Sequence, residues 1–238
     1  MSKTDFEEAR ESEKAYHAHL YETEEILEPG SWLSEPIPAV MEYLELVIAG
    51  NPNPAVLDLG CGSGRNAIPI AKRLQEAGDG RLTGSDLLEE AASKLAENAR
   101  KYGVEKQVEA VRCDAEKADY EPDAYDYVVA CGCLEHVSSE DALKAVIGRL
   151  QQATRTGGIH CLAMNTGISE RAAATGEELD AKIELNLPEE EADRLLRDAY
   201  ADWNLLRDER NDVAVEEEKY EEKTEFTARS VLMVFQKS

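Results

Sequence analysis

The sequence lacks any apolar run long enough to cross a bilayer, and its beginning lacks the apolar stretch of a secretory signal. A membrane-spanning helix needs about 20 predominantly apolar residues in succession. The chain instead begins MSKTDFEEARESEKAY, which is charged where a signal peptide requires an apolar segment. We therefore expect a cytoplasmic protein that has no membrane partner.

Positive charge is also scarce. The chain has 26 lysine and arginine residues against 50 aspartate and glutamate residues, which gives a formal net charge of −24. Proteins that bind nucleic acid neutralise phosphates with Lys and Arg, and the sequence has neither a basic-aromatic strip nor an Asn-Pro-Pro-Tyr-like base-reading motif. The composition disfavours nucleic acid and favours a small-molecule partner, and it leaves the oligomeric state open.

Cysteine is infrequent and odd in number. Each of the five cysteines lies within or beside a predicted strand, whereas disulfide frameworks of secreted domains carry even numbers at regular spacing. We expect reduced thiols in the core rather than disulfides. The five are Cys61, Cys113, Cys131, Cys133 and Cys161.

The order of apolar segments predicts an α/β fold. Short apolar runs alternate with helical patterns, as in βαβ units around a parallel sheet. Two further strands near the end have no helix between them and predict an antiparallel hairpin. The fold class we expect is a doubly wound, mostly parallel, seven-stranded sheet with an antiparallel C-terminal hairpin. The predicted strands are 55–59, 81–85, 108–112, 125–130, 158–164, 203–210 and 227–236, and the predicted helices are 5–28, 36–49, 65–77, 88–102 and 140–153.

A glycine-rich loop follows the first predicted strand. The segment VLDLGCGSGRNA places Gly60, Gly62 and Gly64 at every second position. In parallel sheets with helices on both faces, ligands bind beyond the carboxyl ends of the strands, and glycine permits a ligand to approach the backbone closely. A dinucleotide fingerprint has the spacing G-x-G-x-x-G, whereas this loop has G-x-G-x-G. The spacing therefore departs from the pattern of NAD-binding proteins.

The segment DLGCGSGRN resembles motif I of the class I S-adenosylmethionine (SAM) dependent methyltransferases. Four later segments in the same order extend the resemblance over residues 54–166: LTGSD, VEAVRCDA, YDYVVACGCLEHV and RTGGIHCLAMN. The resemblance implies a Rossmann-like core, methyl transfer, and SAM as the cofactor. On this basis we expect a single methyltransferase domain over residues 1–238, with 1–50 as an N-terminal helical cap or lid and 51–238 as the core.

The resemblance also implies individual cofactor contacts. The acidic residue that ends the second strand would bind the ribose hydroxyls, and the one that ends the third would face the adenine amino group. The loop glycines and the residues beside these acids would complete the contacts, and the start of the next helix is placed to reach the cofactor carboxylate. The predicted contacts are Gly60, Cys61, Gly62, Gly64, Arg65, Asn66, Asp86 (ribose), Leu87, Asp114 (adenine), Ala115 and the backbone of Cys131. Asp58 lies inside the strand, and we expect it to order the loop by accepting backbone N–H bonds.

The remainder of the chain is similar to TehB-like methyltransferases, the tellurite-resistance branch. SWLSEP before the core, GRN after the glycines, and the segment LNLPEEEADRLLRDAYADWNLLRDE with the final ARSVLMVFQK carry this likeness. The hairpin segment VAVEEEKYEEK does not show the basic residues that the tellurite enzymes present there. The branch is therefore predicted, and the acceptor is left open.

Methyl transfer from a sulfonium needs mainly position and exclusion of water. Glu135 and His136, just past the fourth strand, are the candidate bases for a nitrogen or oxygen acceptor. Their alternative role is structural, as a helix cap or surface ion pair for Glu135 and as packing on the sheet edge for His136. A sulfur, selenium, tellurium or arsenic acceptor would need no base.

Three further positions are candidates for the substrate pocket. Trp32 and Tyr16 would belong to a lid over the site, although ordinary helix packing explains them equally well. Cys133 lies with Cys131 where the methyl group should point, so the two thiols are candidate ligands for a metalloid. Alternatively, they are small residues that leave room for the cofactor. His17 and His19 lie two apart, face different sides of a helix, and read as surface residues, so no metal site is expected.

The function predicted from these residues is transfer of a methyl group from SAM to a small-molecule acceptor by in-line displacement. The alternatives are a catalytically inactive SAM-binding sensor or scaffold, a methyltransferase for tellurite, selenite or arsenite, and a nucleotide-binding oxidoreductase. The glycine spacing and Asp114 disfavour the oxidoreductase.

Overall fold

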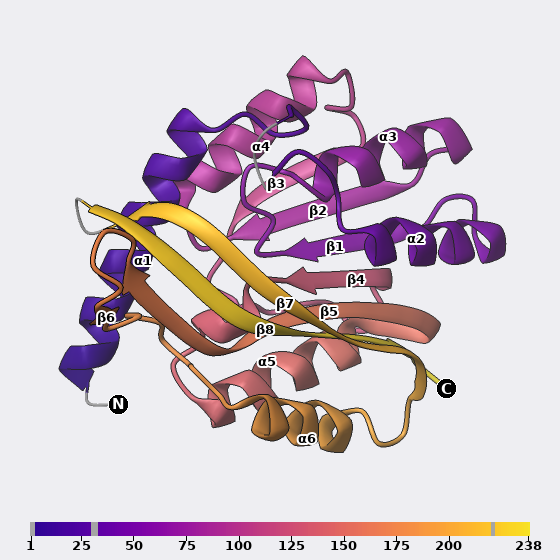
Figure 1. Ribbon diagram of the computed structural model, residues 1–238. Helices are drawn as coiled ribbons and strands as arrows, with labels where there is room; N and C mark the ends of the chain where they lie inside the picture. The colour runs from indigo at the N-terminus through magenta and orange to yellow at the C-terminus, as the bar shows by residue number, and fades with distance from the viewer. Residues whose placement is uncertain (1–2, 30–32, 220–221) are drawn as a thin grey trace.

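The computed structural model describes residues 3–29, 33–219 and 222–238. One mixed sheet forms the centre, and helices cover both of its faces (Figure 1). The helices are α1 (Lys3–Thr23), α2 (Pro38–Gly50), α3 (Ala67–Ala77), α4 (Glu89–Lys101), the short 3-10 helix η1 (Leu134–His136), α5 (Glu140–Ala153) and α6 (Glu189–Ala199). The strands are β1 (Ala55–Leu59), β2 (Arg81–Asp86), β3 (Val108–Arg112), β4 (Tyr125–Cys131), β5 (Thr154–Ala172), β6 (Glu178–Leu179), β7 (Asn204–Lys219) and β8 (Glu222–Gln236).

The sheet confirms the predicted α/β class. Seven strands lie in the order β3-β2-β1-β4-β5-β8-β7, and β6 adds a short eighth strand on β5. The first five strands of this order pair in parallel, whereas β8 is antiparallel to both β5 and β7. The chain order reverses between β1 and β4, which is the position where such sheets bind ligands.

Alternating side chains along the central strands build two separate hydrophobic cores. Val56 and Val129 face the layer of α2, α3 and α4, and Leu57 and Val128 face the layer of α5 and α6. This alternation follows from the two-residue period of a strand, and burial on both faces explains why β1 and β4 read as continuous apolar runs. The Tyr127 hydroxyl donates to the carbonyl of Val40 at 2.9 Å and so joins β4 to α2.

The C-terminal strands are longer than predicted. β5 continues eight residues beyond 164. β7 extends to Lys219 instead of ending at 210, and β8 starts at Glu222 instead of at 227. Charged and polar residues hide this extension in the sequence, because one face of the long hairpin is solvated and its alternation is interrupted. A register shift between Thr166 and Ser169, with Gly167 at φ 55°, bends β5 there.

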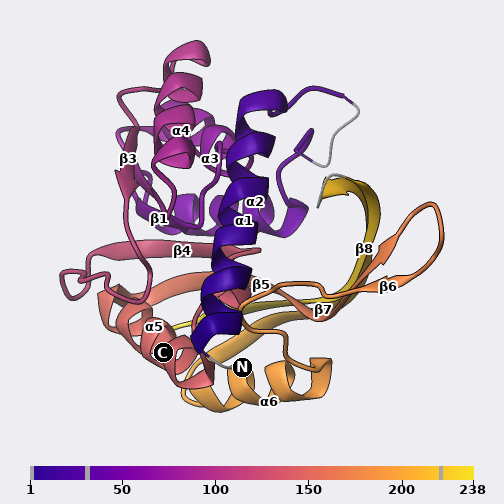
Figure 2. The same cartoon turned by 90° about the vertical axis from the view of Figure 1, so that its left-hand side faces the viewer.

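Helix α1 lies across the carboxyl end of the sheet (Figure 2). It ends at Thr23, five residues before the predicted end at residue 28. Pro29 disfavours helical geometry at the residue before it, and Leu27 has a left-handed φ of 61°. Beyond the helix, Glu25 forms an ion pair of 2.8 Å with Lys101 of α4. None of the helices in the described part of the chain has the length and hydrophobicity of a membrane-spanning segment.

Candidate functional site

The glycine loop turns sharply at the carboxyl end of β1. Gly60, Gly62 and Gly64 all have positive φ, at 68°, 51° and 104°. The backbone N–H groups of Gly60 and Cys61 donate to the carbonyl of Ser85 at 2.8 and 3.1 Å. The loop is therefore fixed to β2, the neighbouring strand, in a conformation that favours glycine.

Protein side chains already occupy the space beside these glycines. A Cβ atom on Gly60 would lie 2.3 Å from Cβ of Cys133, and one on Gly62 would lie 2.8 Å from the Tyr21 hydroxyl. A Cβ on Gly64 would lie 2.7 Å from Leu95, and Gly64 lines no cavity that we describe below. The glycine at position 64 is thus explained by core packing.

Asp86 orders the loop, a role that we had expected of Asp58. Its Oδ2 accepts from the backbone N–H of Gly62 at 3.0 Å, and its Oδ1 accepts from that of Leu88 at 3.0 Å. Oδ2 of Asp58 has no hydrogen-bond partner among residues 3–29, 33–219 and 222–238. Burial, with the charge of Asp86, raises the pKa of Asp58 to about 8, so this buried carboxyl is largely protonated at neutral pH.

A first cavity opens between the ends of β1, β2 and β3 and the underside of α1. Asp114 lines this cavity and accepts from the backbone N–H of Glu116 at 3.1 Å and from Nζ of Lys117 at 2.8 Å. Burial opposes ionisation of Asp114, but these two bonds outweigh it and lower its pKa. The predicted contacts that line the first cavity are Gly60, Asp86, Leu87, Asp114 and Ala115.

A second cavity lies between α1, the glycine loop and the β7–β8 hairpin. Its wall includes the apolar side chains of Val213, Val215, Phe226 and Leu232. The predicted residues that line it are Tyr16, Gly60, Cys61, Gly62, Arg65, Asn66, Cys131, Glu135 and His136. Trp32, the other predicted lid residue, lies outside the described residues.

Arg65 and Asn66 hold the segment before α2 over the glycine loop. Nε of Arg65 donates to the carbonyl of Glu35 at 2.7 Å, and Oδ1 of Asn66 accepts from the backbone N–H of Ile37 at 3.0 Å. Their role as contacts of a cofactor carboxylate remains a prediction.

The two thiols near the site bond to backbone carbonyls. Sγ of Cys133 donates to the carbonyl of Leu59 at 3.1 Å, and Sγ of Cys131 donates to that of Cys161 at 3.7 Å. The bond to Cys161 and burial raise the pKa of Cys131, and burial and the charge of Glu135 raise that of Cys133. Both are neutral thiols, which do not favour metalloid binding because the thiolate is the ligand form. All five cysteines are free, as predicted.

The two predicted catalytic residues differ in their exposure to the cavities. Glu135 is 2% exposed, and its Oε1 accepts from the backbone N–H of Asn165 at 3.2 Å. It lines the second cavity but not the first. His136 lines both cavities, and its Nδ1 lies 2.8 Å from Oε2 of Glu184. Burial lowers the pKa of His136, but the bond to Glu184 and the acidic charges outweigh it and raise the pKa to about 9. His136 is thus a cationic donor at neutral pH.

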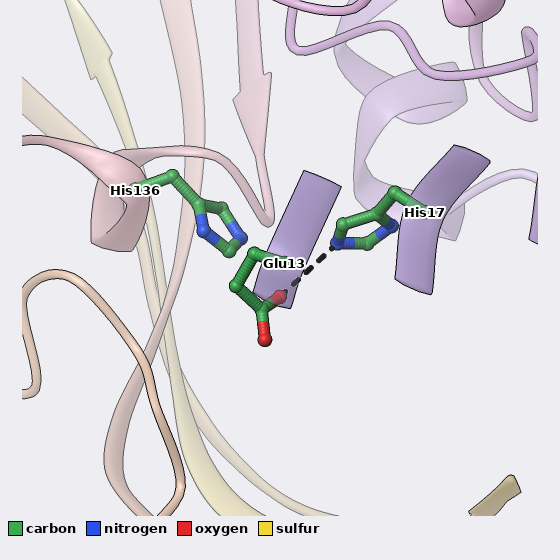
Figure 3. A group of neighbouring side chains, drawn as sticks. All are labelled: Glu13, His17 and His136. Atoms are coloured by element: carbon green, nitrogen blue, oxygen red, sulfur yellow. Dashed lines mark ion pairs between the residues drawn. The ribbon is translucent and has the colours of Figure 1, made fainter. Parts of the chain in front are cut away.

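Helix α1 adds two residues that sequence reasoning missed, Glu13 and His17. They lie on one face of the helix with Tyr21, one turn apart, and all three line both cavities together with Gly60, Gly132 and His136. His17 was expected on the surface, and that prediction is wrong because its face of α1 covers the site (Figure 3). His19 is exposed, so the two histidines do face different sides. The helical period of α1 indicated that these residues share a face, but nothing in the sequence showed which face is covered.

The comparisons with known proteins agree with this geometry. Residues 56–158 match the family model described as a methyltransferase domain. No curated protein sequence matches the chain at a significant level.

Solved structures share the fold. A SAM-dependent methyltransferase from Methanosarcina mazei has a TM-score of 0.60 at 19% identity, over 85% of this chain and 98% of that one. TehB from Haemophilus influenzae has a TM-score of 0.59 at 19% identity, over 85% of this chain and 64% of that one. The [4+2]-cyclase SpnF has a TM-score of 0.60 at 18% identity, over 88% of this chain and 84% of that one. The domain match over residues 56–158 and the shared fold support the predicted methyltransferase with a class I fold, and TehB is among the structures that share this fold.

Proposed function

We propose that this chain, which carries a class I, SAM-dependent methyltransferase domain, transfers a methyl group to a small organic acceptor held in the second cavity. The observation that supports this proposal is that the two cavities share one wall, formed by residues of α1 and by Gly60, Gly132 and His136. The two cavities therefore adjoin at the end of β4. An acceptor in the second cavity and a methyl donor in the first would approach each other there.

The residues of the first cavity fit the adenosine part of SAM. Each carboxylate oxygen of Asp86 accepts one backbone bond, and an ionised carboxylate has about four lone-pair sites. Both oxygens thus retain capacity to accept from ribose hydroxyls. Asp114, which is ionised and lines the same cavity, is placed to accept from the adenine amino group.

SAM supplies a methyl group on a positively charged sulfur, which is already activated for in-line displacement. The chain then has to align the acceptor and exclude water, and well-aligned reactants gain several kcal/mol from this positioning. Tyr21 lies over Gly62, and residues of α1 line both cavities. These features would keep water from the reacting atoms.

His136 is the residue that we assign to the acceptor atom. Its Nδ1 is bound to Glu184, so Nε2 is the nitrogen that would donate to an acceptor oxygen or sulfur. Glu135 would shape the floor of the second cavity, where Oε1 bonds to the backbone of β5.

The lining of the second cavity supports an uncharged organic acceptor. The carboxyl groups of Glu13 and Glu135 are balanced there by Arg65 and His136, and the β7–β8 hairpin adds an apolar wall. This lining suits an organic molecule better than an oxyanion such as tellurite. The net charge of −24 also supports a small molecule over nucleic acid, and the free cysteines support a cytoplasmic location.

The test is to incubate the protein with SAM and a panel of amines, phenols, enols and thiols and to measure S-adenosylhomocysteine, which forms with each methyl transferred. The proposal expects acceptor-dependent product that falls strongly in Val213→Trp, a variant that fills the second cavity, while SAM binding is unchanged. The matched control Leu205→Trp, at an exposed position of the same strand, should retain activity. Tight SAM binding with no product for any acceptor would instead favour a non-catalytic sensor or scaffold.

A further inference from the structure

Three side chains of metal-ligating type converge where the two cavities meet. Glu13 and His17 come from α1 and His136 from η1, and one potential ligand atom of each lies within 4.8 Å of the others (Figure 3). Glu13 and His17 are four residues apart and therefore share one face of the helix. Oε2 of Glu13 lies 3.4 Å from Nε2 of His17.

The surroundings of His136 follow the pattern of a metal ligand. A metal-bound histidine usually donates its other ring N–H to a carboxylate, which fixes the ring and the tautomer. Nδ1 of His136 lies 2.8 Å from Oε2 of Glu184, and Oε1 of Glu184 accepts from Nε of Arg10 at 3.3 Å. This arrangement leaves Nε2 of His136 as the ligand atom, and a metal ion that binds there displaces the proton that Nε2 carries in the metal-free protein. The ion then takes the place of the N–H donor that we assigned to the acceptor atom above.

Two residues that line the second cavity carry polar atoms without partners among the described residues. The atoms are Nδ1 of His17 and Oε2 of Glu135, and only 2% of Glu135 is exposed. A buried polar atom without a partner costs about 1–3 kcal/mol. These atoms indicate that the site is built for a polar occupant.

We propose that Glu13, His17 and His136 bind a divalent transition-metal ion of the zinc type. Two imidazoles and one carboxylate favour zinc, iron or cobalt over magnesium or calcium, which prefer oxygen ligands. Three protein ligands with one open position are characteristic of catalytic rather than structural zinc sites. In a tetrahedral site the ligand atoms lie roughly 3.4 Å apart, so the cluster contracts slightly around the ion.

Glu13, His17 and His136 all line the second cavity, so an acceptor held there can take the open position of the ion, and this identifies the acceptor class. This part of the inference rests on the proposed methyl transfer. A metal-bound hydroxyl or thiol group ionises near neutral pH, so the acceptor is an alcohol, phenol, enol or thiol bound through that atom. Its proton goes to solvent, its oxygen or sulfur forms the new bond to the methyl carbon, and the electron pair of the broken bond stays on the donor sulfur. The ion does not change oxidation state.

The experiment is a titration of the metal-free protein with Co²⁺, followed by visible absorption. The proposal expects one equivalent with intense bands of a four- or five-coordinate ion, and displacement by Zn²⁺. His17→Gln and His136→Gln should each weaken cobalt binding at least about tenfold. Glu184→Gln should weaken it about tenfold, because its hydrogen bond to Nδ1 of His136 orients that ligand. His19→Gln, an exposed position on the same helix, is the control and should bind normally.

Loosely held cobalt on surface carboxylates would give only the weak absorption of a hexahydrated ion. That spectrum, or binding unchanged in both histidine variants, would overturn the proposal. Thermal melting of each variant checks that it is folded. Because His17 lies on α1 and His136 on η1, a local structural defect in one variant would not explain a loss of binding in both. Binding of S-adenosylhomocysteine by the wild type separates the two claims. Normal binding of this nucleoside with no specific cobalt binding contradicts the metal site alone, and specific cobalt binding with no binding of the nucleoside contradicts the proposed function.

Discussion

At the scale of single residues, neighbouring side chains occupy the space that a Cβ atom would need in the glycine loop. Gly60 has a φ of 68°, and a Cβ there would meet Cys133 at 2.3 Å. Gly103 has a similar φ of 72° with nothing within 4 Å of the added atom. The pair therefore separates backbone strain from steric clash.

We predict that Gly103→Ala lowers the free energy of unfolding by about 1–2 kcal/mol, the cost of a left-handed non-glycine residue. Gly60→Ala should cost clearly more, and it should also weaken SAM binding because the loop must move away from Cys133. Denaturant unfolding of both variants measures the difference. Equal losses in the two variants would show that the contact with Cys133 has no energetic importance.

A buried histidine gives a prediction on pH. Burial and the charge of Lys237 lower the pKa of His160 to about 3, and its two ring nitrogens lie 2.7 Å from the hydroxyls of Thr154 and Tyr200. Below pH 6.5 an unfolded histidine binds a proton that the native one does not. The contribution of His160 to the free energy of unfolding is therefore fully present above about pH 6.5. It falls towards pH 3 by up to about 1.4 kcal/mol per pH unit.

Urea unfolding between pH 4.5 and 7.5 measures this slope. His160→Gln should lower stability at every pH and flatten the slope below 6.5, whereas the exposed His19→Gln should leave the slope as it is. An unchanged slope in His160→Gln would contradict the assigned protonation state.

The sequence allowed some site residues to be predicted and concealed others. Asp86 and Asp114 were found because each ends a strand at a fixed place in a recognisable order, and both line the first cavity. His17 and Glu184 could not be found in this way. His17 reaches the site because α1 packs over it, and Glu184 reaches it through a contact with His136, which lies 48 residues earlier in the chain. Neither contact depends on a local sequence pattern.

At the scale of elements, Arg10 attaches α1 to the site through polar contacts. Arg10 donates to the backbone carbonyl of His136 at 2.7 Å and to Glu184 at 3.3 Å. Its side chain is 16% exposed, and hydrogen bonds of a charged group contribute about 1.5–3 kcal/mol. Arg10 therefore stabilises the first half of α1 against the site.

We predict that Arg10→Ala speeds amide hydrogen exchange in α1 by about tenfold or more, which corresponds to that energy, while exchange in α3 and α4 is unchanged. The control is Lys14→Ala, since Lys14 forms its ion pair with Glu11 on the same helix at 2.9 Å. Equal exchange in the wild type and Arg10→Ala would show that other contacts hold α1.

The elements of the parallel half were predicted better than those of the C-terminal half. β1 to β4 lie within about one residue of their predicted bounds, since strands buried on both faces are marked by apolar runs. The extensions of β5, β7 and β8 were not visible, because hydrogen bonding between solvated strands places no demand on hydrophobicity. These extensions make the wall of the second cavity, so the part of the site that selects the acceptor was the least predictable.

At the scale of the whole molecule, the excess of acidic charge opposes folding. The formal net charge is −24, and self-repulsion of a highly charged chain destabilises its compact state. Raising the salt concentration from 0.01 to 0.15 M shortens the screening length from about 30 to about 8 Å. Surface ion pairs weaken at the same time, but each contributes little.

We predict that this change raises stability at pH 7.5 by on the order of 1 kcal/mol, or about 2–4 °C in Tm for a chain of this size. The same change at pH 4.5, close to the sequence pI of about 4.5, should have almost no effect. A melting temperature that falls with salt at pH 7.5 would mean that ion pairs, and not net repulsion, dominate the surface electrostatics.

The central claim is that the glycine loop, Asp86 and Asp114 form a binding site for SAM. The most direct test is calorimetric titration of the purified protein with S-adenosylhomocysteine, together with Asp86→Ala and the exposed-site control Asp119→Asn. The account predicts one equivalent bound by the wild type and the control, and affinity reduced at least about tenfold in Asp86→Ala, because a ribose hydrogen bond to a charged group is lost. Absence of binding, or equal binding in Asp86→Ala, would contradict it.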